Sequence, residues 1–217
     1  MRRTAPFSIA EDKDANLIKS ACFDIETTAL EGVGAGMTIC ACVRPLATQR
    51  TRDFRLKYRA EWDPKTEGFL QFEETEFLKE LIEELAKYDL LIGQNIINFD
   101  LPYLRTRCYQ RGLPYDLNPF VYDTMKAFGR VKFRTVLNGF GKPSKSLDMI
   151  ADFLGVTQEK TKIYPVEHWM TVWGNDTKRE ESMQNILNHC RADVRMTTRI
   201  YEIMLPFDTK GLIRRWI

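Results

Sequence analysis

The sequence predicts a single α/β domain with a mixed central sheet flanked by helices. Two observations lead to this fold class. The first third of the chain reads as three strands, and a helix, a strand and another helix follow it. The order is therefore βββαβα, with more helices after it. The 217 residues contain no internal repeat and no Pro/Ser-rich linker. We therefore treat residues 1–217 as one domain, with its core at about 17–204.

The predicted strands lie at about 17–25, 36–44 and 50–58. The glycine-rich segment 32–36 leads into the second strand and not into a helix, so we interpret it as a hairpin connection and not as a phosphate-binding loop. Antiparallel pairing of these strands, followed by parallel additions, gives the mixed sheet.

The later elements follow from periodicity and from stop signals. Apolar residues at helical spacing predict a helix over about 75–87, and the run 89–93 reads as a short buried strand. A helix over about 100–111 ends at Gly112 and Pro114. We expect a short helix at 146–154 and a last helical region at 179–204 that can contain a break.

The composition sets the compartment. No run approaches the roughly 18 apolar residues of a membrane span, and the N-terminus has no signal-peptide pattern. The five cysteines are odd in number and mostly lie in apolar surroundings, so we interpret them as small core residues of a reducing compartment. The expectation is a cytoplasmic protein without a membrane partner, in the host cytoplasm if the protein is viral.

The net charge of the chain is only +2, but one segment is strongly basic. From Thr124 to Leu147 there is no acid, and phenylalanines and glycines are interleaved with six basic residues: Lys126, Arg130, Lys132, Arg134, Lys142 and Lys145. A basic loop with aromatic residues can follow phosphates and stack on bases. We therefore predict a nucleic-acid contact here, and a solvated face for the shorter basic stretch Arg50 to Arg59.

The first strand ends in two acids, Asp24 and Glu26. Side chains alternate across a strand, so both point to one face, roughly 7 Å apart at the backbone. Two like charges on one face repel unless a cation neutralises them, and hard oxygen ligands suit Mg²⁺ or Mn²⁺. The alternative is a solvated strand end with two incidental acids.

Two more acids follow in suitable places. Asp100 lies where the strand 89–93 gives way to a helix, and it could simply cap that helix. Asp193 lies at the edge of the inward stripe of the last helix, one turn after His189. An ion pair of Asp193 with His189 or an arginine is the alternative to a metal ligand.

Taken together, these segments resemble the three exonuclease motifs of the DEDD superfamily of 3′→5′ exonucleases. The closest likeness is to the proofreading exonuclease domains of family B DNA polymerases and to their stand-alone viral and bacterial relatives. The phrases that carry it are Phe23-Asp24-Ile25-Glu26-Thr27, the run from Asn95 to Leu104, Ser146-Leu147-Asp148 and Cys190-Arg191-Ala192-Asp193-Val194.

The resemblance implies a ribonuclease H-like fold and hydrolysis of phosphodiester bonds with two Mg²⁺ or Mn²⁺ ions. It implies that Asp24 bridges both ions, that Glu26 and Asp193 complete the tighter site, and that Asp100 holds the second ion. It also places Asn95 and Phe99 near the terminal nucleotides, although Phe99 could equally belong to the core.

The chain departs from this pattern at one position. The closest relatives have a tyrosine four residues before the last aspartate, where this chain has His189. The histidine branch of the superfamily has its histidine five residues before, where this chain has Asn188. A neutral imidazole in the tyrosine position could orient the attacking water or accept its proton.

The leading hypothesis is a 3′→5′ exonuclease that acts on single-stranded or frayed DNA ends and releases nucleoside monophosphates. An exoribonuclease and a catalytically weak nucleic-acid-binding module with the same fold are the alternatives. The chain contains no polymerase region, so we expect an autonomous nuclease or a module that works with a polymerase or another protein of replication or repair.

Overall fold

The computed structural model describes residues 18–30, 36–58, 72–129, 145–157, 163, 165–173, 176–207 and 213–216. Within these residues, none of the helices has the length and the apolar character that crossing a membrane requires.

The centre of the fold is a six-stranded sheet with strand order β3-β2-β1-β6-β7-β8. Its strands are β1 (Ser20–Thr27), β2 (Thr38–Pro45), β3 (Arg52–Arg55), β6 (Leu90–Gly93), β7 (Phe120–Asp123) and β8 (Arg214–Arg215). β1, β6 and β7 are parallel to one another, whereas β2, β3 and β8 pair antiparallel with their neighbours. A separate two-stranded ladder joins β4 (Lys57–Tyr58) to β5 (Phe72–Glu73).

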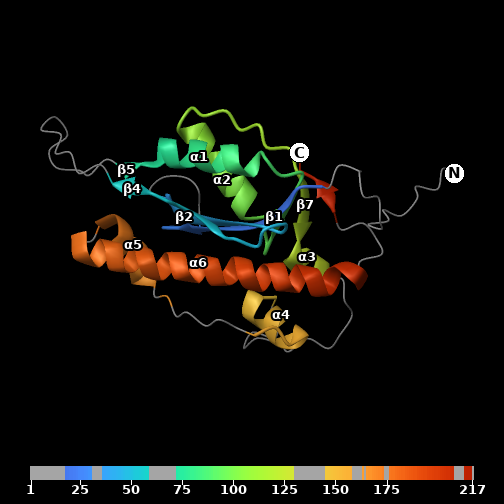
Figure 1. Cartoon of the computed structure of the whole chain (residues 1–217). Coiled ribbons are helices and arrows are strands. Elements are labelled where there is room, and N and C mark those ends of the chain that lie inside the picture. Colours follow the sequence, from blue (N-terminus) through green and yellow to red (C-terminus); the bar gives the residue numbers. More distant parts are fainter. Residues whose placement is uncertain are drawn as a thin grey trace, which may run out of the picture.

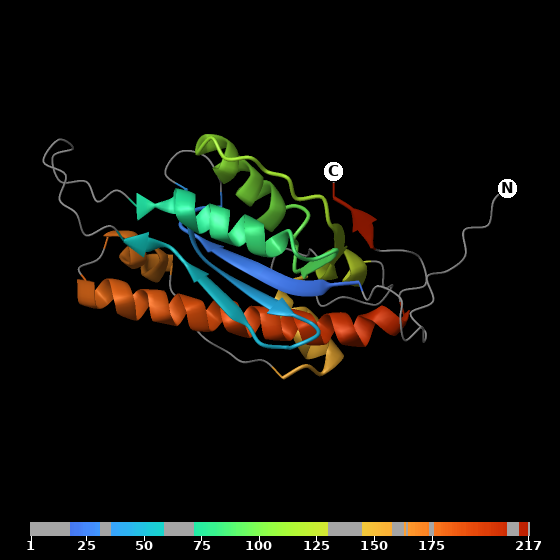
Figure 2. The ribbon, with the colours of Figure 1, turned by 45° about the horizontal axis from the view of Figure 1, so that its top comes forward.

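Helices cover both faces of the sheet (Figures 1 and 2). One face carries α1 (Glu74–Leu85) and α2 (Asp100–Gln110). The long helix α6 (Asp176–Met204) runs along the other face, and α4 (Leu147–Leu154) packs against it. Three short helices complete the set: α3 (Thr124–Phe128), α5 (Pro165–Trp173) and the 3₁₀ helix η1 (Leu205–Phe207).

The alternation of side chains along β1 divides the interior into two cores. Ala21, Phe23 and Ile25 pack with α1 and α2. Cys22 points to the opposite face and packs with the buried stripe of α6. Because Asp24 and Glu26 share the parity of Cys22, the two acids lie on the α6 side of the sheet.

A buried ion pair joins the last turn of α2 to α1 and β2. Glu74, the first residue of α1, is fully buried and accepts two hydrogen bonds from the Nε atom of Arg107, at 3.0 and 3.1 Å. The same carboxylate accepts the backbone N–H of Thr38 at 2.9 Å. These bonds connect the N-terminal ends of α1 and β2 with the C-terminal turn of α2.

The fold class and most of the main elements predicted from the sequence are confirmed, with differences of a few residues at most ends. The single strand predicted at 50–58 is instead two strands, β3 in the central sheet and β4 in the separate ladder. The break allowed for in the last helical region is absent, because α6 is continuous from Asp176 to Met204. Among the described residues, the sequence analysis missed six short elements: β5, β7, α3, α5, η1 and β8. Elements of two to nine residues depend on tertiary contacts, and local periodicity over so few residues is weak.

Candidate functional site

The candidate site lies where β1 ends beneath α6. Carboxylate oxygens of Asp24 and Glu26 and the Sγ atom of Cys190 all lie within 4.8 Å of one another. Asp24 is opposite Cys42 in the β1–β2 ladder, and Glu26 is opposite Cys40. The two acids are therefore flanked on β2, and faced from α6, by cysteines.

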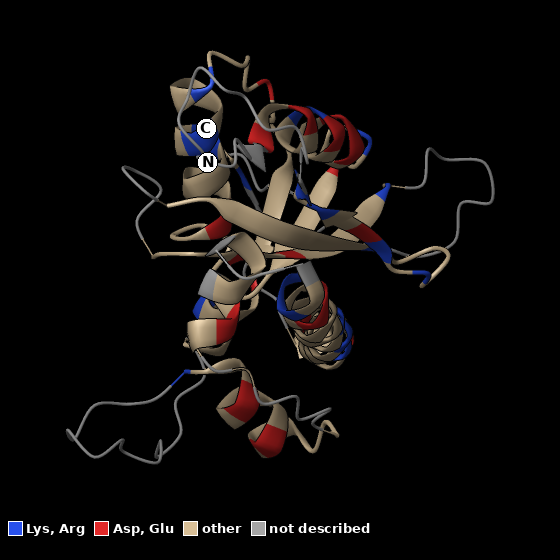
Figure 3. Cartoon of the chain, turned by 90° about the vertical axis from the view of Figure 1, so that its left-hand side faces the viewer, with Lys and Arg blue, Asp and Glu red and all other residues tan. Residues whose placement is uncertain are grey.

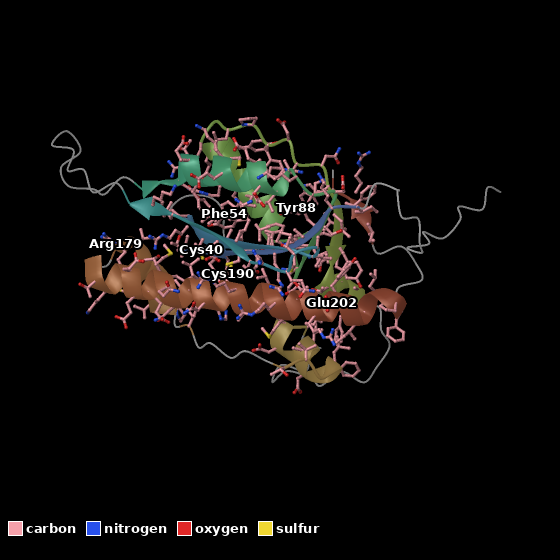
Figure 4. The ribbon with its side chains drawn as sticks, in the orientation of Figure 1. Cys40, Phe54, Tyr88, Arg179, Cys190 and Glu202 are labelled. Atoms are coloured by element: carbon pink, nitrogen blue, oxygen red, sulfur yellow. The ribbon has the colours of Figure 1, made fainter. Side chains whose placement is uncertain are left out.

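These cysteine thiols pack beside Asp24 and Glu26 in their uncharged form. Figure 4 shows Cys40 and Cys190 between the sheet and α6. Burial raises the pKa of the Cys40 thiol to about 11 and that of Cys190 well above its ordinary value. The Sγ atom of Cys190 donates to the backbone carbonyl of Asp24 at 3.5 Å. The thiols therefore add no negative charge to the site at neutral pH.

A tight turn between β6 and α2 delivers Asp100 to the same place. The turn begins at Gly93. A larger residue would not fit there, because its Cβ atom would lie 2.8 Å from the Cβ atom of Ile96. Asn95 adopts a left-handed backbone with φ of 59°, which asparagine tolerates better than most residues. The buried Asp100 then accepts the backbone N–H of Ile25 through Oδ1 at 3.3 Å. This bond joins the Asp100 carboxylate to the backbone of Ile25, the residue between the two acids of β1.

The long helix α6 supplies the fourth acid and its histidine. The sequence predicted an inward stripe of Ile186, Cys190, Val194, Thr197 and Tyr201, and all five side chains are buried. Asp193 lies at the edge of this stripe and His189 one turn before it, with 3.7 Å between His189 Nε2 and Asp193 Oδ2. The expected proximity of this pair is confirmed.

The four predicted carboxylates interact electrostatically. Burial, and then the charges of Asp100, Glu26 and Asp193, raise the pKa of Asp24 well above its ordinary range. Burial raises the pKa of Asp100 to about 7 and that of Asp193 to about 6, and the charge of Glu26 contributes to both. Asp24, Asp100 and Asp193 thus resist ionisation in this site, as expected for acids that share a site suited to cations.

Burial and this repulsion together predict how the stability of the metal-free protein depends on pH. An acid whose pKa is raised on folding contributes stability that is complete below its unfolded pKa and is lost as pH rises through its folded pKa. For Asp100 and Asp193 the loss spans roughly pH 4 to 7. We expect Asp100→Asn to flatten this decline by on the order of 1–3 kcal/mol in urea denaturation with EDTA. Equal pH slopes in the two proteins would contradict the raised pKa of Asp100.

Two residues near the site were missed by the sequence analysis. The Nε2 atom of His168, on α5, lies 3.1 Å from Oε2 of Glu26. The buried Asp123 ends β7, accepts the backbone N–H groups of Ile97 and Lys126, and raises the pKa of Asp100. For Asp123, the sequence signal was a short apolar run that ends in an acid, Phe120 to Asp123. For His168, the only signal was that the chain has two histidines in all.

Three of the predicted nucleic-acid-binding residues lie among the described residues, and four do not. Asn95 and Phe99 lie in the turn before Asp100, where the half-buried Phe99 ring lies 5.5 Å from that of Tyr103. Lys145 is exposed, and its backbone carbonyl accepts a 2.9 Å hydrogen bond from Gln94, the residue before Asn95. The remaining predicted residues of the basic loop, Arg130, Lys132, Arg134 and Lys142, lie outside the described residues.

Comparison with known proteins agrees with this fold. The family model of the RNase H superfamily matches residues 21–205, so the chain belongs to that superfamily and has a nuclease-type fold. A solved structure of the family B DNA polymerase from the hyperthermophilic archaeon Pyrobaculum calidifontis matches with a TM-score of 0.63 and 19% sequence identity. The match covers 91% of this chain and 26% of the polymerase chain. No curated protein matches the chain.

Proposed function

We propose that this protein is a metal-dependent 3′→5′ exonuclease that hydrolyses phosphodiester bonds at single-stranded or frayed DNA ends. The observation that carries the proposal is the convergence of Asp24, Glu26, Asp100 and Asp193 at the end of β1, with His189 beside the last of them. The order of these residues in the sequence follows the DEDD motifs that the chain resembles, and the RNase H-like fold is the one that this resemblance implies.

The donor set fits divalent magnesium or manganese. All four side chains offer hard carboxylate oxygens, and burial together with the charges of the other three raises the pKa of Asp24. In the proposed arrangement Asp24 would help to hold both ions, Glu26 and Asp193 would complete the tighter site, and Asp100 would serve the second. When bound, two such ions would stabilise the attacking and the leaving oxygens of an in-line displacement.

The protein's own groups supply the remaining steps. His189 lies next to Asp193 and is partly exposed, so its imidazole can orient a water molecule or accept its proton. Asn95 and Phe99, in the turn before Asp100, are proposed to contact the terminal nucleotides. The buried thiols under Asp24 exclude water from beneath the acids, and this strengthens electrostatic interactions there.

We propose that the substrate strand leaves the site along the basic segment 124–147. Its C-terminal end meets the turn before Asp100 through the bond between Gln94 and Lys145. In the described part of the chain, α1 carries five acids and one lysine, and basic and acidic residues are interspersed along α6 (Figure 3). The segment 124–147 is therefore the better candidate for a continuous path along phosphates.

Substituting this loop should weaken binding in a salt-dependent way. The triple change Arg130→Ala, Lys132→Ala and Arg134→Ala removes three cations, so fewer counterions are released on binding. We expect a higher Kd for single-stranded DNA and a slope of log K against log salt that is shallower by about 2–3, measured by fluorescence anisotropy. An unchanged slope would place the strand on another surface.

The experiment that tests the proposed function is a paired digestion. End-labelled DNA and RNA oligonucleotides of the same sequence are incubated with the protein in Mg²⁺, Mn²⁺ or EDTA. We expect faster degradation of DNA, and none in EDTA. Faster degradation of RNA would identify an exoribonuclease, and tight binding without degradation would identify a binding module.

We propose a polymerase or another protein of replication or repair as the partner, and a reducing, cytoplasmic compartment as the location. The five cysteines are all buried and free, which suits such a compartment.

A further inference from the structure

The two histidines of the chain come from different helices, yet both contact a predicted metal-binding acid. His189 on α6 lies beside Asp193, whereas His168 on α5 lies beside Glu26, 142 residues away in sequence. Both side chains of the second pair are only slightly exposed, at 21% for His168 and 14% for Glu26. The sequence motifs assign no role to His168.

The direction of the bond between His168 and Glu26 follows from chemistry. An ionised carboxylate can only accept hydrogen bonds, so the Nε2 atom of His168 must carry the hydrogen. This N–H binds Oε2 of Glu26 at 3.1 Å. The other ring nitrogen, Nδ1, then takes no part in holding the acid.

The bond opposes movement of the Glu26 carboxylate away from Asp24. A carboxylate oxygen of Glu26 lies within 4.8 Å of one of Asp24, and like charges at this distance repel. A glutamate side chain has several rotamers and can swing away to relieve that repulsion. His168 opposes this movement, so the acid is held in place before any cation arrives.

We propose that His168 is a positioning residue that restricts Glu26 to one-oxygen metal binding and thereby favours Mg²⁺ and Mn²⁺ over Ca²⁺. With Oε2 occupied by the histidine, Glu26 offers the cation its other oxygen. Small ions with octahedral coordination accept such a ligand, whereas Ca²⁺ takes more oxygens and often binds carboxylates through both. This inference rests on the proposed function, because it concerns the metal site of the exonuclease.

Equilibrium metal binding tests the proposal without reference to activity. Mn²⁺ affinity is measured by electron paramagnetic resonance of the free ion, and Ca²⁺ affinity by displacement of Mn²⁺. For His168→Ala we expect Mn²⁺ binding about 10-fold weaker, because loss of an outer hydrogen-bond partner commonly has this effect. Ca²⁺ binding should weaken less, so the preference for Mn²⁺ over Ca²⁺ should fall.

Two variants separate the hydrogen bond from simple packing. His168→Gln retains an N–H donor that can reach Glu26, and it should restore most of the Mn²⁺ affinity. Asn185→Ala is the matched control, because it removes a 2.9 Å hydrogen bond to Glu167 that joins α6 to α5 without touching Glu26. Its metal binding should equal that of the unaltered protein. If His168→Ala melts early in EDTA, His168→Phe replaces it, since phenylalanine keeps a ring but has no donor.

The outcomes distinguish this inference from the proposed function. Equal Mn²⁺ affinity in His168→Ala and in the unaltered protein overturns the inference and leaves the exonuclease standing. Equal weakening of Mn²⁺ and Ca²⁺ binding overturns the proposed selectivity. Absence of Mn²⁺ binding to the unaltered protein overturns the exonuclease proposal and the inference together.

Discussion

Asp24→Ala should abolish nuclease activity, with a fall in kcat of at least about a thousandfold. Asp24 is the centre of the candidate site, because the charges of Glu26, Asp100 and Asp193 all act on its pKa. In the proposed arrangement it contacts both ions. Losing the metal's stabilisation of the transition state, about 4 kcal/mol, corresponds to this decrease in rate. The measurement is single-turnover hydrolysis of a labelled oligonucleotide at saturating Mg²⁺.

The same substitution should leave the fold intact and stabilise the metal-free protein at neutral pH. Burial and three neighbouring charges disfavour the ionised form of Asp24, so its removal relieves repulsion. Asp89→Asn is the control, because Asp89 accepts the backbone N–H of Lys19 at the opposite end of β1. That variant should remain active. Hydrolysis by Asp24→Ala at the rate of the unaltered protein would refute the assignment of the site.

His189→Ala should lower kcat by about a hundredfold or more, while His189→Tyr should remain active. An imidazole in this position can orient the attacking water or accept its proton, and general-base assistance contributes about 10²–10⁴-fold. A tyrosine hydroxyl can still orient water. Asn188→Ala is the control, since Asn188 is exposed and precedes His189 in the same turn of α6. The measurement is again single-turnover hydrolysis at saturating Mg²⁺.

Full activity in His189→Ala would show that this histidine is structural. A similar loss in both variants would show that water orientation alone is insufficient and that the imidazole acts as a base.

The sequence predicted the parts of the site that lie on regular elements. Alternation along β1 placed Asp24 and Glu26 on one face, and helical periodicity placed Asp193 and His189 one turn apart on α6. Both predictions needed only the geometry of one element. The convergence of the two elements was implied by the resemblance to exonuclease motifs and not by periodicity.

What the sequence analysis missed depends on contacts between distant segments. His168 reaches Glu26 because α5 packs beside the first turns of α6, and no local pattern around His168 encodes that packing. Asp123 follows a strand of four residues whose pairing with β6 is a tertiary event. Short elements carry little periodic signal, so β7 and α5 could not be placed from sequence.

The polarity and metal dependence of hydrolysis test the central claim most directly. Two copies of one single-stranded DNA oligonucleotide, labelled at the 5′ end or at the 3′ end, are digested in Mg²⁺ and sampled over time. The account predicts that the 3′ label is released at once as a nucleoside monophosphate, that the 5′-labelled strand shortens stepwise, and that EDTA stops both reactions. Internal cleavage, release from the 5′ end, or hydrolysis that continues in EDTA would contradict it.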